Sequence, residues 1–292
     1  MQIPFSPPYI DQDIIDEVTD TLKSGWITTG PKAKLLEEEI AAFCNVENAL
    51  TVSSATSAMM LALHWFGVTR GDEVIIPAYT YCATALAVMH IGATPVMVDV
   101  CEDFNIDPEK IKQAITAKTK AVISVDFSGW PCNYDAINDL LEDETIKQKF
   151  TPSNQKQQAL GRILLLSDAA HALGAVYNNM PVSKCADITV FSLHAVKNVT
   201  SAEGGIICLN MRLPFNNLEI YNTLRLYEKY HSLDQAIDRS LQAKQNGEAV
   251  SIAYIGNAIT MLKRLIQRNI TPDTLTDQTS AHDELVGYFP ES

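Results

Sequence analysis

Seven short runs of β-branched and aliphatic residues recur in the first 210 residues, and most are separated by segments with helical spacing. The runs are 49–53, 72–77, 94–100, 120–127, 161–170, 186–192 and 204–210. Largely continuous apolar runs are typical of strands that are buried on both faces. Their alternation with helices predicts an α/β fold, with a mostly parallel seven-stranded sheet between helices.

The bulk composition is that of an ordinary soluble globular chain, with 47% hydrophobic and 20% charged residues among 292. A net charge of −13 argues against a nucleic-acid-binding protein. The most apolar window, 85–98, is shorter than the ~20 residues that span a bilayer. The N-terminus lacks the features of a signal peptide, and the six cysteines form no C-x-x-C pair. We expect a cytoplasmic protein with reduced cysteines, no metal site and no membrane partner.

The ends of the chain differ from the alternating region. Residues 10–24 have the spacing of an amphipathic helix, and "SGWITTGP" (24–31) interrupts the pattern before a second helix. The polar segment 142–161 is expected to be an exposed insertion. Beyond residue 227 the pattern weakens, with one short helix expected at 258–268 and poor order from 271 onward. The sequence therefore predicts a large domain, 1–227, and a divergent C-terminal segment, 228–292.

Ligands of such sheets bind where the strands end, at their carboxyl edge. The motif "VSSATSA" (52–58) places small hydroxyl residues between a strand and a helix. The N–H groups of this helix start, together with Ser54 and Thr56, could bind a phosphate. Ser and Thr are also ordinary helix N-caps, and capping alone is the commoner explanation of such a motif.

Three further residues follow predicted strands. Asp168 comes after a buried aliphatic run, so its carboxylate needs a cation or N–H donor, with His171 one turn away. A protonated ring nitrogen of a cofactor would serve, although a helix N-cap is an equal alternative. Lys197, preceded by Ser192, could be a desolvated nucleophile or a surface lysine. Tyr81 could stack on a planar ligand or pack in the core.

Taken together, these groups are what pyridoxal 5'-phosphate (PLP) requires. A phosphate-binding turn, an aromatic ring, an acid for the pyridine nitrogen and a lysine for a Schiff base occur in the order usual for that cofactor. The sequence therefore indicates a PLP site, and this use explains a lysine between two buried strands.

Six motifs in this order resemble the DegT/DnrJ/EryC1/StrS nucleotide-sugar aminotransferases, which are fold-type I PLP enzymes. The motifs are "SGWITTGP", "SSATSA", "GDEVIIPAYTY", "GATPVMVDV", "SDAAHALGA" and "FSLHAVKNVTSAEGG". The resemblance covers roughly residues 3–227. It is closest to enzymes that aminate C4 of UDP-linked 4-keto sugars, of the amino-arabinose or pseudaminic acid type.

The resemblance implies a role for each candidate. Lys197 would bind the cofactor covalently and move protons, Asp168 would hold the pyridine nitrogen protonated, and His171 would contact the ring's oxygen side. Tyr81 would stack on the ring. Phosphate binding would fall to Ala55, Thr56 and Ser192, and Trp26 and Thr28 would lie near the sugar. L-Glutamate would donate the amino group to a keto sugar nucleotide, in a cytoplasmic homodimer.

The resemblance also has limits. Ala55 stands where many members have glycine, and Asp126 where many have histidine. Residues 228–292 lack the family's small-domain motifs, so we expect an incomplete C-terminal small domain. Two alternatives remain: a catalytically impaired remnant that keeps the fold, and an unrelated nucleotide-binding protein. The second would require a G-x-G-x-x-G loop, which the sequence lacks.

Overall fold

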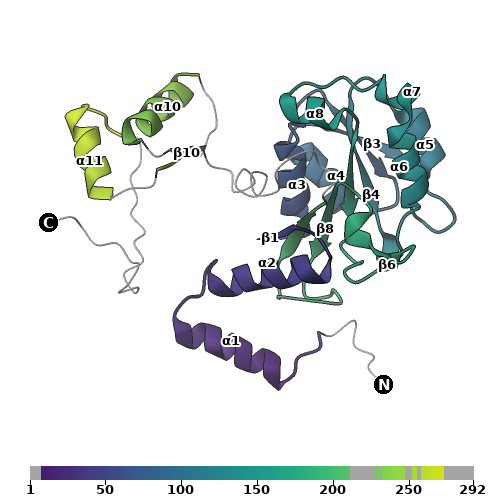
Figure 1. Ribbon diagram of the computed structural model, residues 1–292, viewed down its shortest axis with the longest axis horizontal. Coiled ribbons are helices and arrows are strands. Elements are labelled where there is room, and N and C mark those ends of the chain that lie inside the picture. Colours follow the sequence, from purple (N-terminus) through teal and green to yellow (C-terminus); the bar gives the residue numbers. More distant parts are fainter. Residues whose placement is uncertain (1–7, 211–227, 231, 247–251, 255–257, 273–292) are drawn as a thin grey trace. The chain divides into compact units, whose positions relative to one another are not determined.

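The computed structural model describes residues 8–210, 228–230, 232–246, 252–254 and 258–272. The chain divides into two compact units, residues 1–224 and residues 225–292. The first unit contains a seven-stranded sheet, and the second contains a two-stranded one (Figure 1).

The large sheet contains one strand from each of the seven predicted runs. Its strands are β1 (Asn48–Val52), β2 (Glu73–Pro77), β3 (Thr94–Val98), β4 (Thr119–Val125), β5 (Leu164–Asp168), β8 (Ile188–Ser192) and β9 (Gly205–Leu209). Their order across the sheet is β1-β9-β8-β5-β4-β2-β3. Only β9 runs antiparallel to its neighbours in this sheet, so the expected mostly parallel α/β fold is confirmed.

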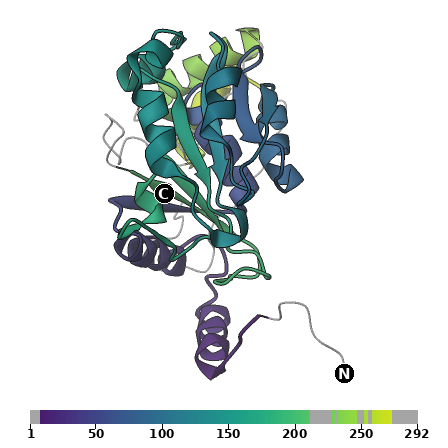
Figure 2. The same cartoon turned by 90° about the vertical axis from the view of Figure 1, so that its right-hand side faces the viewer.

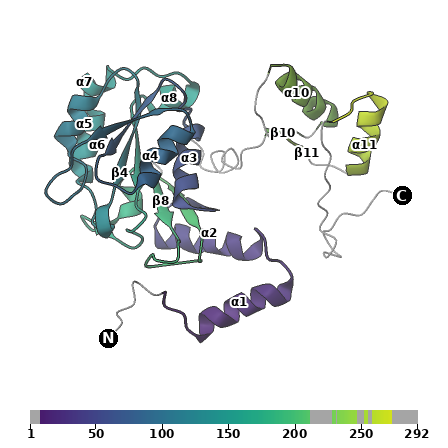
Figure 3. The same cartoon turned by 180° about the vertical axis from the view of Figure 1, so that it is seen from behind.

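Helices cover both faces of this sheet, as expected for buried strands. In Figures 1 and 3, α3 (Ala55–Trp65) and α4 (Cys82–His90) lie on one face, and α5 (Pro108–Ala114) and α6 (Tyr134–Glu142) lie on the other. The central strands are almost fully buried between these layers. The sheet edge is therefore the place where polar side chains can reach a cavity.

Two more helices precede the sheet in sequence. Helix α2 (Pro31–Phe43) packs on β1, where the buried Glu37 carboxylate accepts hydrogen bonds from the N–H and hydroxyl of Thr51 at 2.9 and 2.8 Å. Helix α1 (Gln12–Ser24) has no buried residue and lies away from the sheet (Figure 2). Its predicted apolar stripe is exposed to solvent in this single chain.

A buried ion pair joins β5 and β8 at the sheet edge opposite their carboxyl ends. The guanidinium of Arg162 donates two hydrogen bonds of 2.8 Å to the carboxylate of Asp187, which also accepts from the N–H of Leu165. Such bidentate pairing satisfies both buried charges. It fixes the relative register of the two strands whose far ends carry Asp168 and Ser192.

Most residues of the segment 142–161 are exposed, as expected, but parts of it pack against the core. It contains two short helices, α7 (Glu144–Lys147) and α8 (Gln155–Leu160). Ile146 and Gln157 within them are buried, and the side-chain amide of Gln157 donates to the carbonyl of Phe66 at 3.1 Å. The polar composition hid this packing because the buried contact is made by an amide rather than by an apolar stripe.

Smaller elements complete the first unit. They are the 3-10 turns η1 (Phe127–Gly129) and η2 (Val182–Lys184) and a hairpin of β6 (Val176–Tyr177) and β7 (Met180–Pro181). No helix in the part of the chain that the structure describes is long and apolar enough to cross a membrane.

The second unit contains a parallel pair of strands joined through a helix. Its elements are β10 (Glu228–Tyr230), α10 (Leu233–Asn246), β11 (Ile252–Tyr254) and α11 (Ala258–Gln267). Arg264 forms a bidentate ion pair with Asp234, which joins α11 to α10. The expected helix at 258–268 is confirmed, α10 was not foreseen, and the poor order expected beyond residue 272 falls outside the described residues.

Candidate active site

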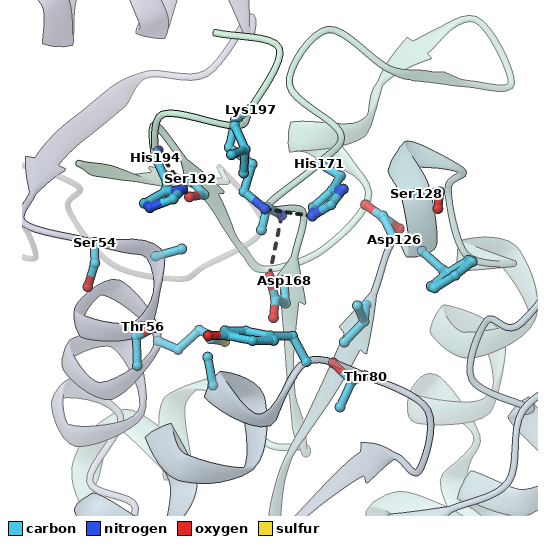
Figure 4. Close-up of a pocket in the computed structure, with 18 of the residues that line it drawn as sticks. Ser54, Thr56, Thr80, Asp126, Ser128, Asp168, His171, Ser192, His194 and Lys197 are labelled. Atoms are coloured by element: carbon cyan, nitrogen blue, oxygen red, sulfur yellow. Dashed lines mark hydrogen bonds between the residues drawn. The ribbon is translucent and has the colours of Figure 1, made fainter. Parts of the chain in front are cut away.

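A cavity of about 790 Å³ lies at the carboxyl edge of the large sheet. It is lined by all seven of the predicted catalytic and cofactor-binding residues: Ala55, Thr56, Tyr81, Asp168, His171, Ser192 and Lys197. Figure 4 shows that the labelled members of this set come from opposite sides and converge on one space. The fold thus brings together residues that lie up to 142 positions apart in the sequence, from Ala55 to Lys197.

Lys197 lies in the loop between β8 and β9 and points into the cavity (Figure 4). Its Nζ lies 2.6 Å from Nε2 of His171, within hydrogen-bonding distance. Burial lowers the pKa of Lys197, and the carboxylate of Asp168 offsets part of this effect. Burial and the lysine's charge also lower the pKa of His171. Both shifts favour the neutral forms, and a neutral amine is the nucleophilic form of lysine.

Asp168 ends β5 and is only 6% exposed. Its Oδ2 accepts a hydrogen bond from the hydroxyl of Thr84 at 2.8 Å, and its Oδ1 accepts from the N–H of Ala170 at 3.3 Å. Burial nevertheless raises the pKa of Asp168, although these two donors and the charge of Lys197 oppose the shift. A buried acid with this shift would be ionised more readily beside a cationic donor.

The phosphate-binding candidate is the start of α3. Ser54 is the N-cap: its hydroxyl accepts from the N–H of Ser57 at 3.1 Å, and Ser57 Oγ accepts from the N–H of Ser54 in a reciprocal capping box. The capping interpretation is therefore confirmed for Ser54. The N–H groups of Ala55 and Thr56 belong to the first turn, which has no intrahelical acceptor, and this is a geometry suited to an anion.

The position of α3 depends on a close approach by β9. A Cβ added to Gly205 would lie 2.3 Å from the carbonyl carbon of Ser54 and 2.5 Å from the nitrogen of Ala55. Only a residue without a side chain permits this contact. Gly205 also pairs with Ser192, whose side chain lines the cavity beside the same helix start.

Tyr81 and the two predicted substrate residues differ in their placement. Tyr81 is 79% exposed and lines the cavity, so its ring is available to a ligand and is not part of the core. Trp26 and Thr28 lie in the loop between α1 and α2 and do not line the cavity. The indole of Trp26 instead donates to the carbonyl of Thr29 at 3.1 Å. Their proposed contact with a sugar stays a prediction.

Sequence reasoning noted Asp126 but missed the buried network that it forms beside Asp168. Asp126 follows β4, and its Oδ1 accepts from the N–H of Cys132 and from the hydroxyl of Tyr134, each at 2.9 Å. Tyr134 is also 2.7 Å from the hydroxyl of Ser167. Burial raises the pKa of Asp126 to about 6, against these donors, and the nearby Asp168 raises it further. A charge directly after a buried strand was the available signal.

Sequence reasoning also missed aromatic residues that line the cavity. Tyr79 and Phe127 line it, and both rings contact Phe104. Aromatic residues after a strand are ordinary core residues by default, so the sequence offered little that would single these out. The lone signal was that Tyr79 lies in the same loop as Tyr81.

The residues present fit PLP. The start of α3 could hold a phosphate, Asp168 could receive a ring N–H, Tyr81 could cover a ring face, and Lys197 could reach an aldehyde carbon. Asp168 fits this role because its carboxylate is buried, and burial raises its pKa although Thr84 and Ala170 donate to it. The fold and the cavity together have the features of the large domain of a PLP-binding enzyme.

Residues 8–148 match the DegT/DnrJ/EryC1/StrS aminotransferase family, so the predicted resemblance of the first unit to this family is confirmed. Residues 206–292 match a different family, the urocanase Rossmann-like domain. The second match was not foreseen from the sequence. It overlaps the first unit at β9 and includes the parallel strand pair of the second.

Curated relatives agree with the first match. The Bacillus subtilis spore coat polysaccharide biosynthesis protein SpsC is 39% identical over 206 residues, which are 70% of this chain and 49% of SpsC. The UDP-4-amino-4-deoxy-L-arabinose–oxoglutarate aminotransferase of Shewanella sediminis is 38% identical over 244 residues, covering 83% of this chain and 56% of the relative. The chain thus spans about half the length of these relatives.

Solved structures give the same result. Spr1654 of Streptococcus pneumoniae, named as a sugar aminotransferase, has a TM-score of 0.75 in its PMP form and in its PLP form. The sequence identity is 45% and 44%, and each alignment covers 77% of this chain and 57% of that chain. The predicted family and fold class are confirmed by these likenesses.

Proposed function

We propose that this chain carries the cofactor-binding half of a PLP-dependent aminotransferase that moves an amino group from L-glutamate to a keto sugar nucleotide. The acceptor is proposed to be a UDP-linked 4-keto sugar, as the name of the Shewanella relative suggests. The observation that carries the proposal is the convergence of Lys197, His171 and Asp168 on one cavity.

When bound, PLP supplies an electron sink that stabilises negative charge on the carbon from which a proton is removed. The protein's residues supply the rest. Lys197 is half-buried and shifted toward its neutral form, so its Nζ can attack a carbonyl carbon and later accept or return a proton. His171, 2.6 Å away, fixes the direction of the Nζ lone pair or N–H.

Asp168 keeps a ring nitrogen protonated because its buried carboxylate gains most when a cation is beside it. The hydroxyl of Thr84 donates to Oδ2 at 2.8 Å and so orients this carboxylate. The first turn of α3 and Ser192 hold the phosphate end. We also propose that the active form is a cytoplasmic homodimer, in which a second copy covers part of the exposed apolar surface that includes α1.

A second candidate is a remnant that binds the cofactor but does not turn over. One observation favours it: the C-terminal residues, 206–292, match another family. The two candidates share the cofactor site. They differ in whether glutamate can complete the first half-reaction.

The test is covalent trapping. Full-length protein is incubated with PLP, reduced with borohydride and digested, and the labelled peptide is identified by mass spectrometry. We expect a visible absorbance band and a label on Lys197. Lys197→Ala should lose both, whereas Lys118→Ala, which removes an exposed lysine far from the cavity lining, should keep both.

Glutamate then separates the two candidates. Loss of the visible band on adding L-glutamate would support the aminotransferase, and a band that glutamate does not change would support the remnant. No band in the wild-type protein, or a label spread over many lysines, would contradict both.

A further inference from the structure

Three aromatic rings form a wall at the cavity: Tyr79 and Phe127 line it, and Phe104 packs against both of them. The aromatic wall consists of Tyr79, Phe104 and Phe127, which come from the loops after β2, β3 and β4. Their ring centroids lie 5.2, 5.2 and 5.3 Å apart, so each ring touches both others. The wall therefore spans the carboxyl ends of three neighbouring strands.

These rings remain accessible although they are large and apolar. Tyr79 is 52% exposed and Phe104 is 49% exposed, and Tyr79 and Phe127 line the same cavity as Lys197. Solvent-exposed aromatic surface beside a polar cavity is characteristic of ligand sites, in which apolar walls bury the ligand and a few polar groups orient it.

The protein holds the wall in place at a conformational cost. Phe104 has a φ of 67° and Ser128, next to Phe127, has a φ of 52°, a region that residues other than glycine seldom adopt. Asn105, only 2% exposed, links the two loops: its Oδ1 accepts from the N–H of Phe127, and its Nδ2 donates to the carbonyls of Trp130 and Pro131. Backbone strain maintained by a buried clamp is common at functional sites.

The wall lies close to the reacting lysine. A Cβ on Gly129, in the turn that begins with Phe127, would lie 2.7 Å from the carbonyl oxygen of His171, so this turn is in contact with the backbone of His171. The ring of His171 is in turn 2.6 Å from Nζ of Lys197. The turn that begins with Phe127 therefore contacts the residue that lies beside Lys197, and both Phe127 and Lys197 line one cavity.

Acidic residues near the wall also restrict the class of ligand that can bind there. Phe104 is flanked in sequence by Glu102, Asp103 and Asp107, and the N–H of Asn105 donates to Asp103 rather than to a ligand. Acidic side chains disfavour a diphosphate at this position by like-charge repulsion. An uncharged ring with an apolar face fits better.

We propose that the aromatic wall binds the hexose ring of the amino acceptor against its apolar face, and so positions the carbonyl carbon toward Lys197. This inference rests on the proposed function and deepens it, because it assigns a surface to the part of the substrate next to the reacting atom. Tyr79, Phe104 and Phe127 are positioning residues for that ring.

The test compares two probes on the full-length protein with PLP bound. UDP-glucose carries a hexose without a keto group, so it binds without reacting, and UDP lacks the hexose. Calorimetric titration gives the dissociation constant of each for wild type, Phe104→Ala and Phe127→Leu. Val176→Ala, which trims a side chain that is 61% exposed outside the cavity, is the matched control.

We expect wild type and Val176→Ala to bind UDP-glucose more tightly than UDP. In each wall variant, the dissociation constant for UDP-glucose should rise about five- to tenfold, the range for loss of one aromatic contact. The dissociation constant for UDP should stay unchanged. Equal weakening of both probes would assign the wall to the base and overturn the proposal. No change in the variants, or no preference for UDP-glucose in wild type, would also overturn it.

Two controls keep the outcome readable. Thermal melting followed by circular dichroism shows whether each variant is folded, and Tyr79→Leu replaces any wall variant that is not. Trapping of PLP on wild-type Lys197 tests the proposed function separately, so failure to bind the cofactor is distinguished from failure of the wall to bind a sugar.

Discussion

The polar side of the cavity and its aromatic wall are built by different physical means. On the polar side, Asp168, His171 and Lys197 are held by specific hydrogen bonds, and burial shifts the pKa of each toward its neutral form. On the wall, three rings contact each other and a buried asparagine fixes their loops. One cavity therefore combines a polar part, which we propose transfers protons, and an aromatic part, which we propose positions the substrate.

The largest effect should come from damage to the phosphate end of the polar side. Gly205→Ala places a Cβ 2.3 Å from the backbone of Ser54, and neither backbone can move without separating α3 from β9. We expect the free energy of unfolding to fall by about 3 kcal/mol, at the upper end for overpacking. Urea unfolding measures this change, and PLP titration should show weaker binding.

Gly71→Ala is the control for a glycine change without crowding. Gly71 has no heavy atom within 4 Å of an added Cβ, but its φ of 96° would be strained for alanine, so Gly71→Ala reports backbone strain without crowding. If Gly205→Ala costs no more than this control, the close approach does not position the phosphate end.

A smaller, pH-dependent effect should come from Asp126, where the two sides meet. Its backbone N–H donates to the carbonyl of Asp168 at 3.1 Å, and it precedes Phe127 in sequence. The pKa of its carboxyl is about 6 in the folded protein, against a model-peptide value near 3.8. Between these values the folded state keeps a proton that the unfolded state has lost, so this group's contribution is full below about pH 4 and lost as pH rises through about 6.

Asp126→Asn removes this titration but keeps an oxygen that can accept from Cys132 and Tyr134. Relative to wild type, the free energy of unfolding of the variant should therefore rise by about 2–3 kcal/mol between pH 4 and pH 7, and then level off. Urea unfolding of both proteins across this range measures the difference. A difference that is constant with pH would show that Asp126 is ionised throughout.

The two sides also differ in how well the sequence predicted them. Asp168 and Lys197 could be identified because a charged side chain beside a buried strand is costly unless it has a partner or a function. Tyr79 and Phe127 could not be identified, because aromatic residues at such positions are ordinarily core residues. Phe104 has a positive φ, which the sequence does not reveal. The seven strands were predicted because each is a continuous apolar run, which local composition records.

Long-range contacts set the limit of that prediction. The close contact of β9 with the start of α3 depends on Gly205, and the sequence alone did not distinguish this glycine from an ordinary turn residue. Segment 142–161 was expected to be exposed because its composition is polar. The side-chain amide of Gln157 in this segment nevertheless donates to the buried carbonyl of Phe66. No motif or periodicity in the C-terminal residues indicated their match to another family.

Asp168 is a buried acid, and we propose that its carboxylate pairs with the protonated ring nitrogen of PLP. Melting temperatures of wild type and Asp168→Asn, each with and without PLP, test it directly. Without PLP, the variant should melt at or above the wild type, because a costly buried acid is gone. PLP should raise the melting temperature of the wild type well above its effect on the variant. An equal rise in both proteins would contradict the assignment of Asp168 to the cofactor's ring nitrogen.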